Sequence, residues 1–378
     1  MTDTTNKTLI FKKIPTDYPV PGEHLVIEDK GFNPNAAAPE GGLVLSILYA
    51  SFDPYQRGRM REANTKSYTP PYHLNEPVTN ATVAKVLKSD NADYKEGDLV
   101  IAHLPIAEYA TLTKEQVGQT VQNKINNLHN LKDLGLFLGP LGMPGLTAWS
   151  SYHEIGQPKK GETIFVSSAA GAVGQVVGQI AKREGLKVIG SVGSDEKLDF
   201  IINELGFDGG FNYKKEKPLD ALKRLAPEGI DIYYENVGGE HLQAALECLN
   251  QWGRIVACGM VRFYSPPFPI SSPVNNKILT LSKQISQYNA KPEERYGVTN
   301  LFHIVSKRID FRGFIVSDKD FGPKHYKEHQ EQLSQWIADG SVKFKLHYTE
   351  GIDKAAEGLV GIFKGENFGK AVLHVKDE

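Results

Sequence analysis

The sequence predicts an α/β protein that combines a doubly wound parallel sheet with a second, β-rich domain. Three observations support this. Residues 1 to about 130 contain short β-like runs separated by turns, whereas strand-like and helix-like segments alternate from about 131 onward, as in βαβ units. The length of 378 residues also exceeds the ~250–300 residues over which a single hydrophobic core keeps growing.

The alternating part predicts its elements in order. Strands are expected at 162–168, 186–192, 210–213, 230–237, 253–260 and 309–316. A helix is expected between the first two strands, because apolar residues recur there at helical spacing: Val173, Val176, Val177 and Ile180.

The same spacing predicts a further helix after the fourth strand. A polar helix is expected at about 325–339. The apolar stripe of the former consists of Leu242, Ala245, Leu246 and Leu249. The tail then returns to strand, helix and strand, and we expect it to rejoin the first domain. The expected domains are therefore 1–129 with 341–378, and 130–340.

Composition excludes several classes of protein. Hydrophobic residues make up 40% and charged residues 23%, as in globular proteins, and 43 basic against 45 acidic side chains give a net charge of −2. A nucleic-acid-binding surface is not indicated. The only cysteines, Cys248 and Cys258, suit a reducing compartment, and the first residues lack the apolar run of a secretory signal, so we expect a cytoplasmic protein without a membrane partner.

The segment SSAAGAVGQVVGQIAK directly follows a predicted strand and opens a predicted helix. Ala169, Gly171 and Gly174 occupy the glycine positions of the dinucleotide fingerprint G-x-G-x-x-G. Gly171 lets the backbone approach a pyrophosphate, which would lie at the helix N-terminus, and Gly174 lets the helix pack on the strand. The alternative is a glycine-rich structural turn, but the flanking strand and helix favour a nucleotide site.

The end of the next strand favours NADPH over NADH. An NAD site expects an acidic side chain there, yet the strand ends in Ser191, Val192 and Gly193. Lys197 follows one turn into the next helix, where it could pair with a 2′-phosphate. The alternative is that Lys197 is an ordinary solvated residue and Asp195 merely a helix cap.

No metal is predicted. Catalytic zinc requires clustered cysteine, histidine or carboxylate ligands, whereas the first domain has no cysteine. Its histidines are scattered along the sequence: His24, His73, His103 and His129.

Strings along nearly the whole chain carry a family resemblance. They are DPYQRGRM (53–60), SYTPPYHLNEPV (67–78), GPLGMPGLTAW (139–149), AAGAVGQVVGQIAK (169–182), GSDEKL (193–198), FNYK (211–214), PEGIDIYYENVGG (227–239), CGM (258–260), ISQYN (285–289), FRGFIV (311–316) and ENFGKAV (366–372). The chain resembles the zinc-independent medium-chain dehydrogenases/reductases, in the group of prostaglandin reductases and alkenal double-bond reductases.

This resemblance implies a Rossmann domain, a β-rich GroES-like catalytic domain, and NADPH-dependent reduction of the activated C=C bond of enones or enals. Hydride goes to the β-carbon and a proton to the α-carbon. The alternatives are an NADPH-dependent quinone reductase and a non-catalytic NADPH-binding protein. The substrate is then a small α,β-unsaturated carbonyl compound. Because members of the family are commonly dimers, the resemblance also implies a possible homodimer.

The resemblance also implies roles for individual residues. The pyrophosphate is held by Gly171, Ala172, Val173 and Gly174, and the 2′-phosphate end by Lys197 and Tyr213. The rest of the cofactor is lined by Asn236, Cys258, Gly259, Phe314, Ile315, Val316 and Asn367. Tyr288, near the substrate carbonyl, is the expected catalytic residue, because a phenol can donate to the oxygen that becomes an enolate. Tyr55 and Tyr68 are candidate substrate-pocket walls, although both could equally be packed aromatics of a β-domain.

The chain departs from the family at one point. The family string CGMISQYN is continuous, but here residues 261–284 separate Met260 from Ile285, and removing these 24 residues restores it. Our hypothesis is that 261–284 is translated from a retained intron; the alternative is a loop insertion that alters substrate choice. Either way the insertion lies between two strings with expected roles in catalysis, so it could weaken catalysis while leaving cofactor binding intact.

Overall fold

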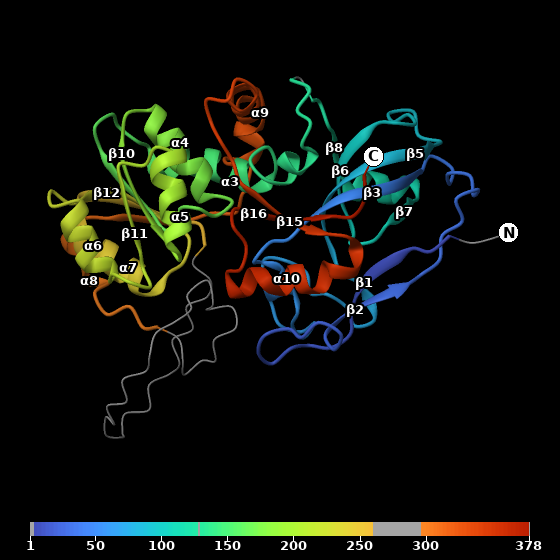
Figure 1. Cartoon of the computed structure of the whole chain (residues 1–378), viewed down its shortest axis with the longest axis horizontal. Coiled ribbons are helices and arrows are strands. Elements are labelled where there is room, and N and C mark those ends of the chain that lie inside the picture. Colours follow the sequence, from blue (N-terminus) through green and yellow to red (C-terminus); the bar gives the residue numbers. More distant parts are fainter. Residues whose placement is uncertain (1–3, 128, 260–295, 378) are drawn as a thin grey trace. The chain divides into compact units, whose positions relative to one another are not determined.

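The computed structural model describes residues 4–127, 129–259 and 296–377 (Figure 1). By their mutual contacts, these residues form two units. The first comprises the chain up to Trp149, Gly171–Val176 and the chain from Gly322 onward, and the second comprises Ser150–Ala170 and Val177–Phe321. Residues 130–149 and 322–340 thus group with the first unit, whereas we had placed them with the parallel sheet, and the domain borders stay a prediction. Residues 261–284 and Tyr288 lie outside the described residues.

The second unit is built on a parallel sheet. Its strands are β9 (Thr163–Val166), β10 (Lys187–Val192), β11 (Gly209–Asn212), β12 (Ile230–Glu235), β13 (Leu249–Ala257) and β14 (Asp310–Gly313). Within the described residues they pair in the order β11-β10-β9-β12-β13-β14. This confirms the doubly wound sheet and the strands predicted for it. The strand order reverses between β9 and β12, which is the switch point where such sheets bind ligands.

Helices connect these strands. They are α4 (Gly174–Arg183), α5 (Asp195–Asp199), α6 (Pro218–Leu225), α7 (Gly239–Cys248) and α8 (Phe302–Ser306), and a π-helical turn at Phe200–Glu204 continues α5. The hydrophobic core between the sheet and α6 and α7 contains Phe165, Tyr233, Leu222 and Leu246. In α4, Val176, Val177 and Ile180 are buried as predicted, whereas Val173 precedes the helix and is half-buried.

The first unit contains two sheets. The smaller has the order β2-β1-β4, from β1 (Lys7–Phe11), β2 (Leu25–Asp29) and β4 (Glu76–Pro77). The larger has the order β15-β16-β3-β5-β6-β8, from β3 (Leu43–Ser51), β5 (Thr79–Ser89), β6 (Leu99–Pro105), β8 (Val121–Lys124), β15 (Leu346–Glu350) and β16 (Lys370–His374), and β7 (Tyr109–Leu112) also pairs with β3. The red strand β16 lies antiparallel beside the blue β3, so the tail belongs to the N-terminal sheet (Figure 1).

The remaining helices are short, with one exception. They are α1 (Gln56–Arg59), α2 (Lys114–Thr120), α3 (Met143–Ser151), α9 (Gly322–Ala338) and α10 (Ala355–Lys364), with 3-10 turns at Leu134–Leu138 and Ile352–Lys354 and a π-helical turn at Tyr152–Gly156. Leu359 and Phe363 of α10 enter a core with Leu9 and Phe52. In the described part of the chain, no helix combines the length and apolarity needed to cross a membrane.

Candidate active site

The predicted pyrophosphate loop occupies the position that the fingerprint requires. Residues 167–173 connect the end of β9 to the N-terminus of α4, where peptide N–H groups favour an anion. Gly171 forms a parallel β-bridge with Gly369, and its carbonyl accepts the N–H of Gln175 at 3.1 Å. Gly171, Ala172 and Val173 are half-buried. Gly171 is thus partly exposed and is held by the segment around Gly369, which belongs to the same unit.

The C-terminal segment meets this loop. The amide of Gln175 clamps Lys345: Oε1 accepts the Lys345 N–H at 2.7 Å, and Nε2 donates to the Lys345 carbonyl at 3.3 Å. That carbonyl also accepts the N–H of Lys370 at 3.1 Å. The side chain of Asn367 donates to the Gly369 carbonyl at 2.7 Å, which fixes Asn367 two residues from the Gly171 bridge. The structure therefore brings together the predicted pyrophosphate loop and Asn367, nearly 200 residues apart in sequence.

A cationic cluster lies at the ends of β10 and β11. Ser194 caps α5 by accepting the Lys197 N–H at 3.2 Å, so the cap is Ser194, whereas Asp195 pairs with Asn212 and Lys215. Burial lowers the pKa of Lys197, and the nearby Lys214 ammonium lowers it further. Because two neighbouring cations repel each other, this position favours a bound anion.

The predicted partner of Lys197 is close to this strand end. A methyl group added at Gly193 would approach the Tyr213 hydroxyl to 3.0 Å, so the phenol lies beside the end of β10. Lys197 and Tyr213, with Lys214, therefore offer donors and positive charge that fit a 2′-phosphate. Lys214 was missed by our sequence reasoning, although it follows Tyr213 directly; its only signal was the doubled lysine in FNYKK.

In the form lacking residues 261–284, replacing Lys197 by alanine is expected to lower kcat/KM for NADPH about tenfold or more, because hydrogen bonds to charged groups contribute ~1.5–3 kcal/mol. The kcat/KM for NADH should stay nearly unchanged. Lys182→Ala is the matched control, since Lys182 pairs with Asp208 instead. Comparable losses with NADPH and NADH would contradict the assigned role.

The ends of β12, β13 and β14 carry the other predicted cofactor residues. Asn236 follows β12, and Cys258 and Gly259 follow β13. The N–H groups of Cys258 and Gly259 donate to the Glu235 carbonyl at 3.0 and 2.9 Å. Burial raises the pKa of the Cys258 thiol to about 12, so this thiol is not a thiolate at neutral pH. Phe314, Ile315 and Val316 come directly after β14, with the Phe314 ring stacked on Phe321 at 4.9 Å. Since parallel strands end at one edge of the sheet, these residues share the edge with Lys197 and Tyr213.

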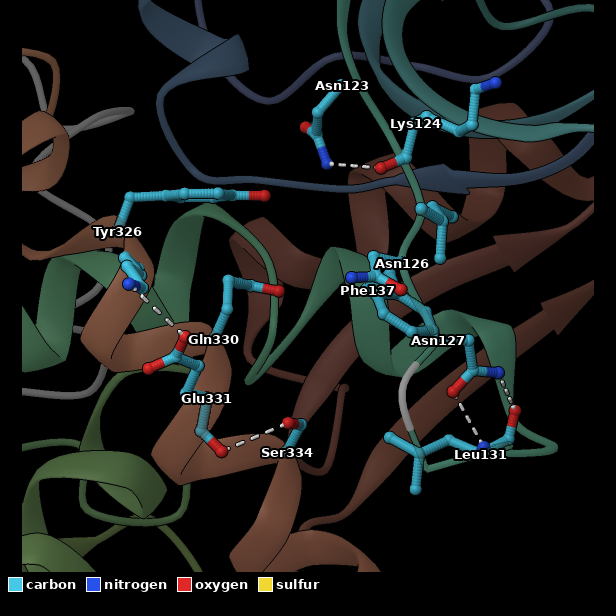
Figure 2. Close-up of a pocket in the computed structure, with 12 residues that line it drawn as sticks. Asn123, Lys124, Asn126, Asn127, Leu131, Phe137, Tyr326, Gln330, Glu331 and Ser334 are labelled. Carbon is cyan, nitrogen blue, oxygen red and sulfur yellow. Dashed lines mark hydrogen bonds and ion pairs between the residues drawn. The ribbon is translucent and has the colours of Figure 1, made fainter.

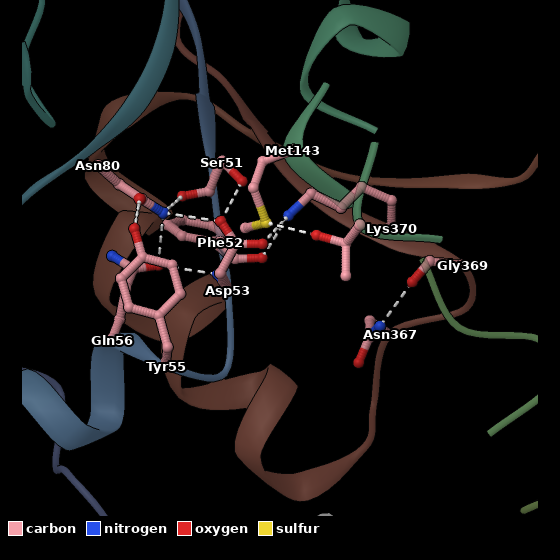
Figure 3. Close-up of polar contacts among 11 residues, drawn as sticks. Ser51, Phe52, Asp53, Tyr55, Gln56, Asn80, Met143, Asn367, Gly369 and Lys370 are labelled. Atoms are coloured by element: carbon pink, nitrogen blue, oxygen red, sulfur yellow. Dashed lines mark hydrogen bonds and ion pairs between the residues drawn. The ribbon is translucent and has the colours of Figure 1, made fainter. Parts of the chain in front are cut away.

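Tyr55 belongs to a buried polar network in the first unit (Figure 3). Its hydroxyl donates to Asn80 Oδ1. The Asn80 Nδ2 donates to the Ser51 carbonyl at 2.7 Å, to Asp53 Oδ2 at 2.9 Å and to Gln56 Oε1 at 3.0 Å. Because three acceptors surround Nδ2, the amide orientation is fixed, and Oδ1 has to face Tyr55.

The buried carboxylate of this network is paired. Lys370 Nζ donates to Asp53 Oδ1 and to the Phe52 carbonyl, each at 2.7 Å, and both charged side chains are almost completely buried. Ser51 donates to Asp53 Oδ2. The network therefore connects Lys370, next to Gly369, with Tyr55 on α1's N-terminal side (Figure 3).

The network limits the hydrogen bonds and proton transfers that are open to the Tyr55 hydroxyl. Its proton is engaged by Asn80, and burial together with the Asp53 charge raises the pKa of Tyr55 far above its ordinary value. Tyr55 can therefore accept a hydrogen bond from a ligand but is a poor proton donor. Tyr68, the other predicted pocket tyrosine, is 64% exposed and contributes to the electrostatic environment of Tyr55, so the two lie near each other.

Comparisons with known proteins agree with this geometry. An N-terminal domain of oxidoreductase matches residues 7–120, and a zinc-binding dehydrogenase domain matches 172–303. The NADP-dependent oxidoreductase RED1 of Cochliobolus heterostrophus is 48% identical over 98% of each chain. A 2-alkenal reductase (NADP(+)-dependent) of Nicotiana tabacum is 40% identical over 100% of this chain and 99% of its own. CurA of Vibrio vulnificus, solved in complex with NADPH, has a TM-score of 0.82 at 31% identity, covering 98% of this chain and 100% of its own.

The chain belongs to the medium-chain dehydrogenase/reductase family. Within this family it falls in the zinc-independent group of prostaglandin reductases and alkenal reductases, and it is an oxidoreductase. Among the residues that the structure describes, no three histidine, cysteine or acidic side chains gather as metal ligands would.

A pocket lies between the segment around β8 and helix α9 (Figure 2). Its volume is about 210 Å³, and both polar and apolar side chains line it: Asn123, Lys124, Ile125, Asn126, Asn127, Leu131, Phe137, Tyr326, Lys327, Gln330, Glu331 and Ser334. The Asn127 amide is used internally, exchanging two hydrogen bonds with the Leu131 backbone at 2.8 Å each. None of the predicted site residues lines this pocket, so it is separate from the candidate active site.

Proposed function

We propose that this reductase uses NADPH to reduce the activated C=C bond of enones or enals. The observation that carries the cofactor assignment is the cluster of Lys197, Tyr213 and Lys214 at the strand ends, where an NAD site would carry an acid. The similarity to the tobacco 2-alkenal reductase and the presence of the ISQYN string support the substrate class. When bound, NADPH supplies a hydride for the β-carbon of the substrate.

The chain would supply binding and the stabilisation of negative charge. We propose Tyr288, which lies outside the described residues, as the donor to the substrate carbonyl oxygen. Tyr55 does not replace it, because its proton is already donated to Asn80. Tyr55 and Tyr68 are proposed as walls of the substrate pocket, with Tyr55 as a hydrogen-bond acceptor.

Replacing Tyr288 by phenylalanine tests this function directly. In the form lacking residues 261–284, the kcat for a simple enone should fall about 10²- to 10³-fold, as is typical when one oxyanion donor is removed. The dissociation constant for NADPH should stay the same, because the ring remains. Tyr326→Phe, on helix α9, is the control. An unchanged kcat for the enone would refute the proposed role of Tyr288.

A second experiment separates the alternatives. NADPH oxidation is followed at ~340 nm for the full-length protein and for a form lacking 261–284, each with an enone and a quinone. We expect enone turnover to be confined to the shorter form, which supports both the reductase and the retained intron. Equal turnover would make the insertion a tolerated loop. Turnover of the quinone alone would favour a quinone reductase. If both forms bind NADPH but neither turns over a substrate, a non-catalytic NADPH-binding protein is favoured. A dominant transcript that retains the 72 nucleotides encoding residues 261–284 would itself refute the intron hypothesis.

A further inference from the structure

Glu235 is a charged residue at the end of β12 that none of the roles above uses. Its side chain is completely buried, with 0% exposure. Oε1 accepts the N–H of Val237 at 2.6 Å and that of Gly238. A buried carboxylate is costly unless hydrogen bonds compensate it, and here two peptide groups of the following loop do so. The carboxylate thereby determines the path of residues 236–238.

The backbone of Glu235 holds the neighbouring strand end. Its carbonyl accepts the N–H groups of Cys258 and Gly259 at 3.0 and 2.9 Å. A methyl group added at Gly259 would overlap the carbonyl of Asn236, so the two segments are in close backbone contact. One residue thus connects the loop after β12 with the end of β13.

Asn236 is oriented by this arrangement together with Ser167 of the adjacent strand end. The Asn236 N–H donates to Ser167 Oγ at 2.9 Å, and Asn236 Nδ2 donates to the Ser167 carbonyl at 2.8 Å. Since Nδ2 is used inside the protein, the amide oxygen of half-buried Asn236 is the atom available to a ligand's donor. Tyr233 completes the support by donating to Ser167 Oγ at 3.1 Å.

We propose that Glu235 is a positioning residue for the nicotinamide half of NADPH. Its carboxylate sets the loop that carries Asn236, and its carbonyl sets Cys258 and Gly259, so that these groups present a preformed surface to that half of the cofactor. Lys197 and Tyr213, which belong to the other half of the sheet, are not held by Glu235. The proposal rests on the cofactor roles proposed above for Asn236, Cys258 and Gly259.

The substitution Glu235→Gln tests the proposal. It keeps the size of the side chain but removes the charge, and charge-assisted hydrogen bonds are about twice as strong as neutral ones. Titration calorimetry on the full-length chain measures binding of NADPH and of adenosine 2′,5′-bisphosphate, which contains only the phosphorylated adenosine end. We expect the dissociation constant for NADPH to rise about tenfold or more, while that for adenosine 2′,5′-bisphosphate changes by less than about twofold.

Glu162→Gln is the matched control. The Glu162 carboxylate also accepts a peptide N–H, from Lys159 at 2.8 Å, and pairs with Arg254, but it lies at the opposite end of the sheet, before β9. It should lower the thermal unfolding temperature without changing the NADPH dissociation constant. The proposal is tested by the dissociation constants for NADPH and adenosine 2′,5′-bisphosphate, which remain valid readouts if the protein proves not to reduce enones.

Two results would overturn the proposal. An unchanged NADPH dissociation constant would make Glu235 a purely structural residue. An equal rise in the dissociation constants of both ligands would show a general loss of structure. If Glu235→Gln does not fold, Ser167→Ala removes the acceptor of the Asn236 N–H and tests the same arrangement. Ser167→Ala has to raise the dissociation constant for NADPH but not that for adenosine 2′,5′-bisphosphate, and any other pattern refutes the proposal.

Discussion

Replacing Lys370 by methionine is expected to lower the free energy of unfolding by about 3–5 kcal/mol, the usual cost of leaving a buried charge without its partner. Lys370 and Asp53 face each other at 2.7 Å with side chains only 2% and 6% exposed. Methionine has a similar shape but no charge, so the Asp53 carboxylate would stay buried beside Asn80 without its cation. Chemical denaturation followed by circular dichroism measures the loss.

Two companion variants isolate the cause. Adding Asp53→Asn to the methionine variant removes the unpaired charge and should recover part of the lost stability. Lys182→Met breaks an ion pair with Asp208 whose side chains are about one third exposed, and should cost only ~0–1 kcal/mol. A loss below about 1 kcal/mol in Lys370→Met would show that the buried pair contributes little to stability.

The second large effect is expected from Gly369→Ala, which should abolish NADPH binding and destabilise the fold. Gly369 has a φ of +83°, where a side chain costs about 1–2 kcal/mol of backbone strain. An added methyl group would also overlap the Lys345 carbonyl, which is backbone and cannot rotate away. The start of β16 would then be displaced from Gly171, its bridge partner at the pyrophosphate loop. Calorimetric titration with NADPH and thermal unfolding measure both effects.

Gly365→Ala is the control for this variant. Gly365 has a similar φ of +71°, but a methyl group there would meet nothing within 4 Å. It should show the backbone strain alone and retain NADPH binding. If Gly369→Ala and Gly365→Ala behave alike, the close approach of Gly369 to Lys345 has no part in holding the loop.

The sequence allowed the parallel sheet to be predicted because each of its strands is a short apolar run between turn residues, and because the glycine-rich segment stands between a strand-like run and a helix-like run. Lys197 could be singled out from its place after the next strand, whereas Tyr213 followed only from the family resemblance. The polar contacts could not be predicted from the sequence. Asp53, Asn80 and Lys370 are far apart in sequence and have no common pattern, so their network follows from sheet pairing between β16 and β3 and between β3 and β5. Glu235 likewise shows no signal of burial, because its partners are peptide groups of the next residues.

The bridge between Gly171 and Gly369 has a consequence for how this protein is made. The glycine loop is translated almost 200 residues before the segment around Gly369 that supports it. A nascent chain can therefore complete its parallel sheet on the ribosome and still lack a finished pyrophosphate site. Affinity for NADPH would arise only once the segment around Gly369 has been synthesised, so that cofactor binding distinguishes molecules that contain this segment from those that lack it.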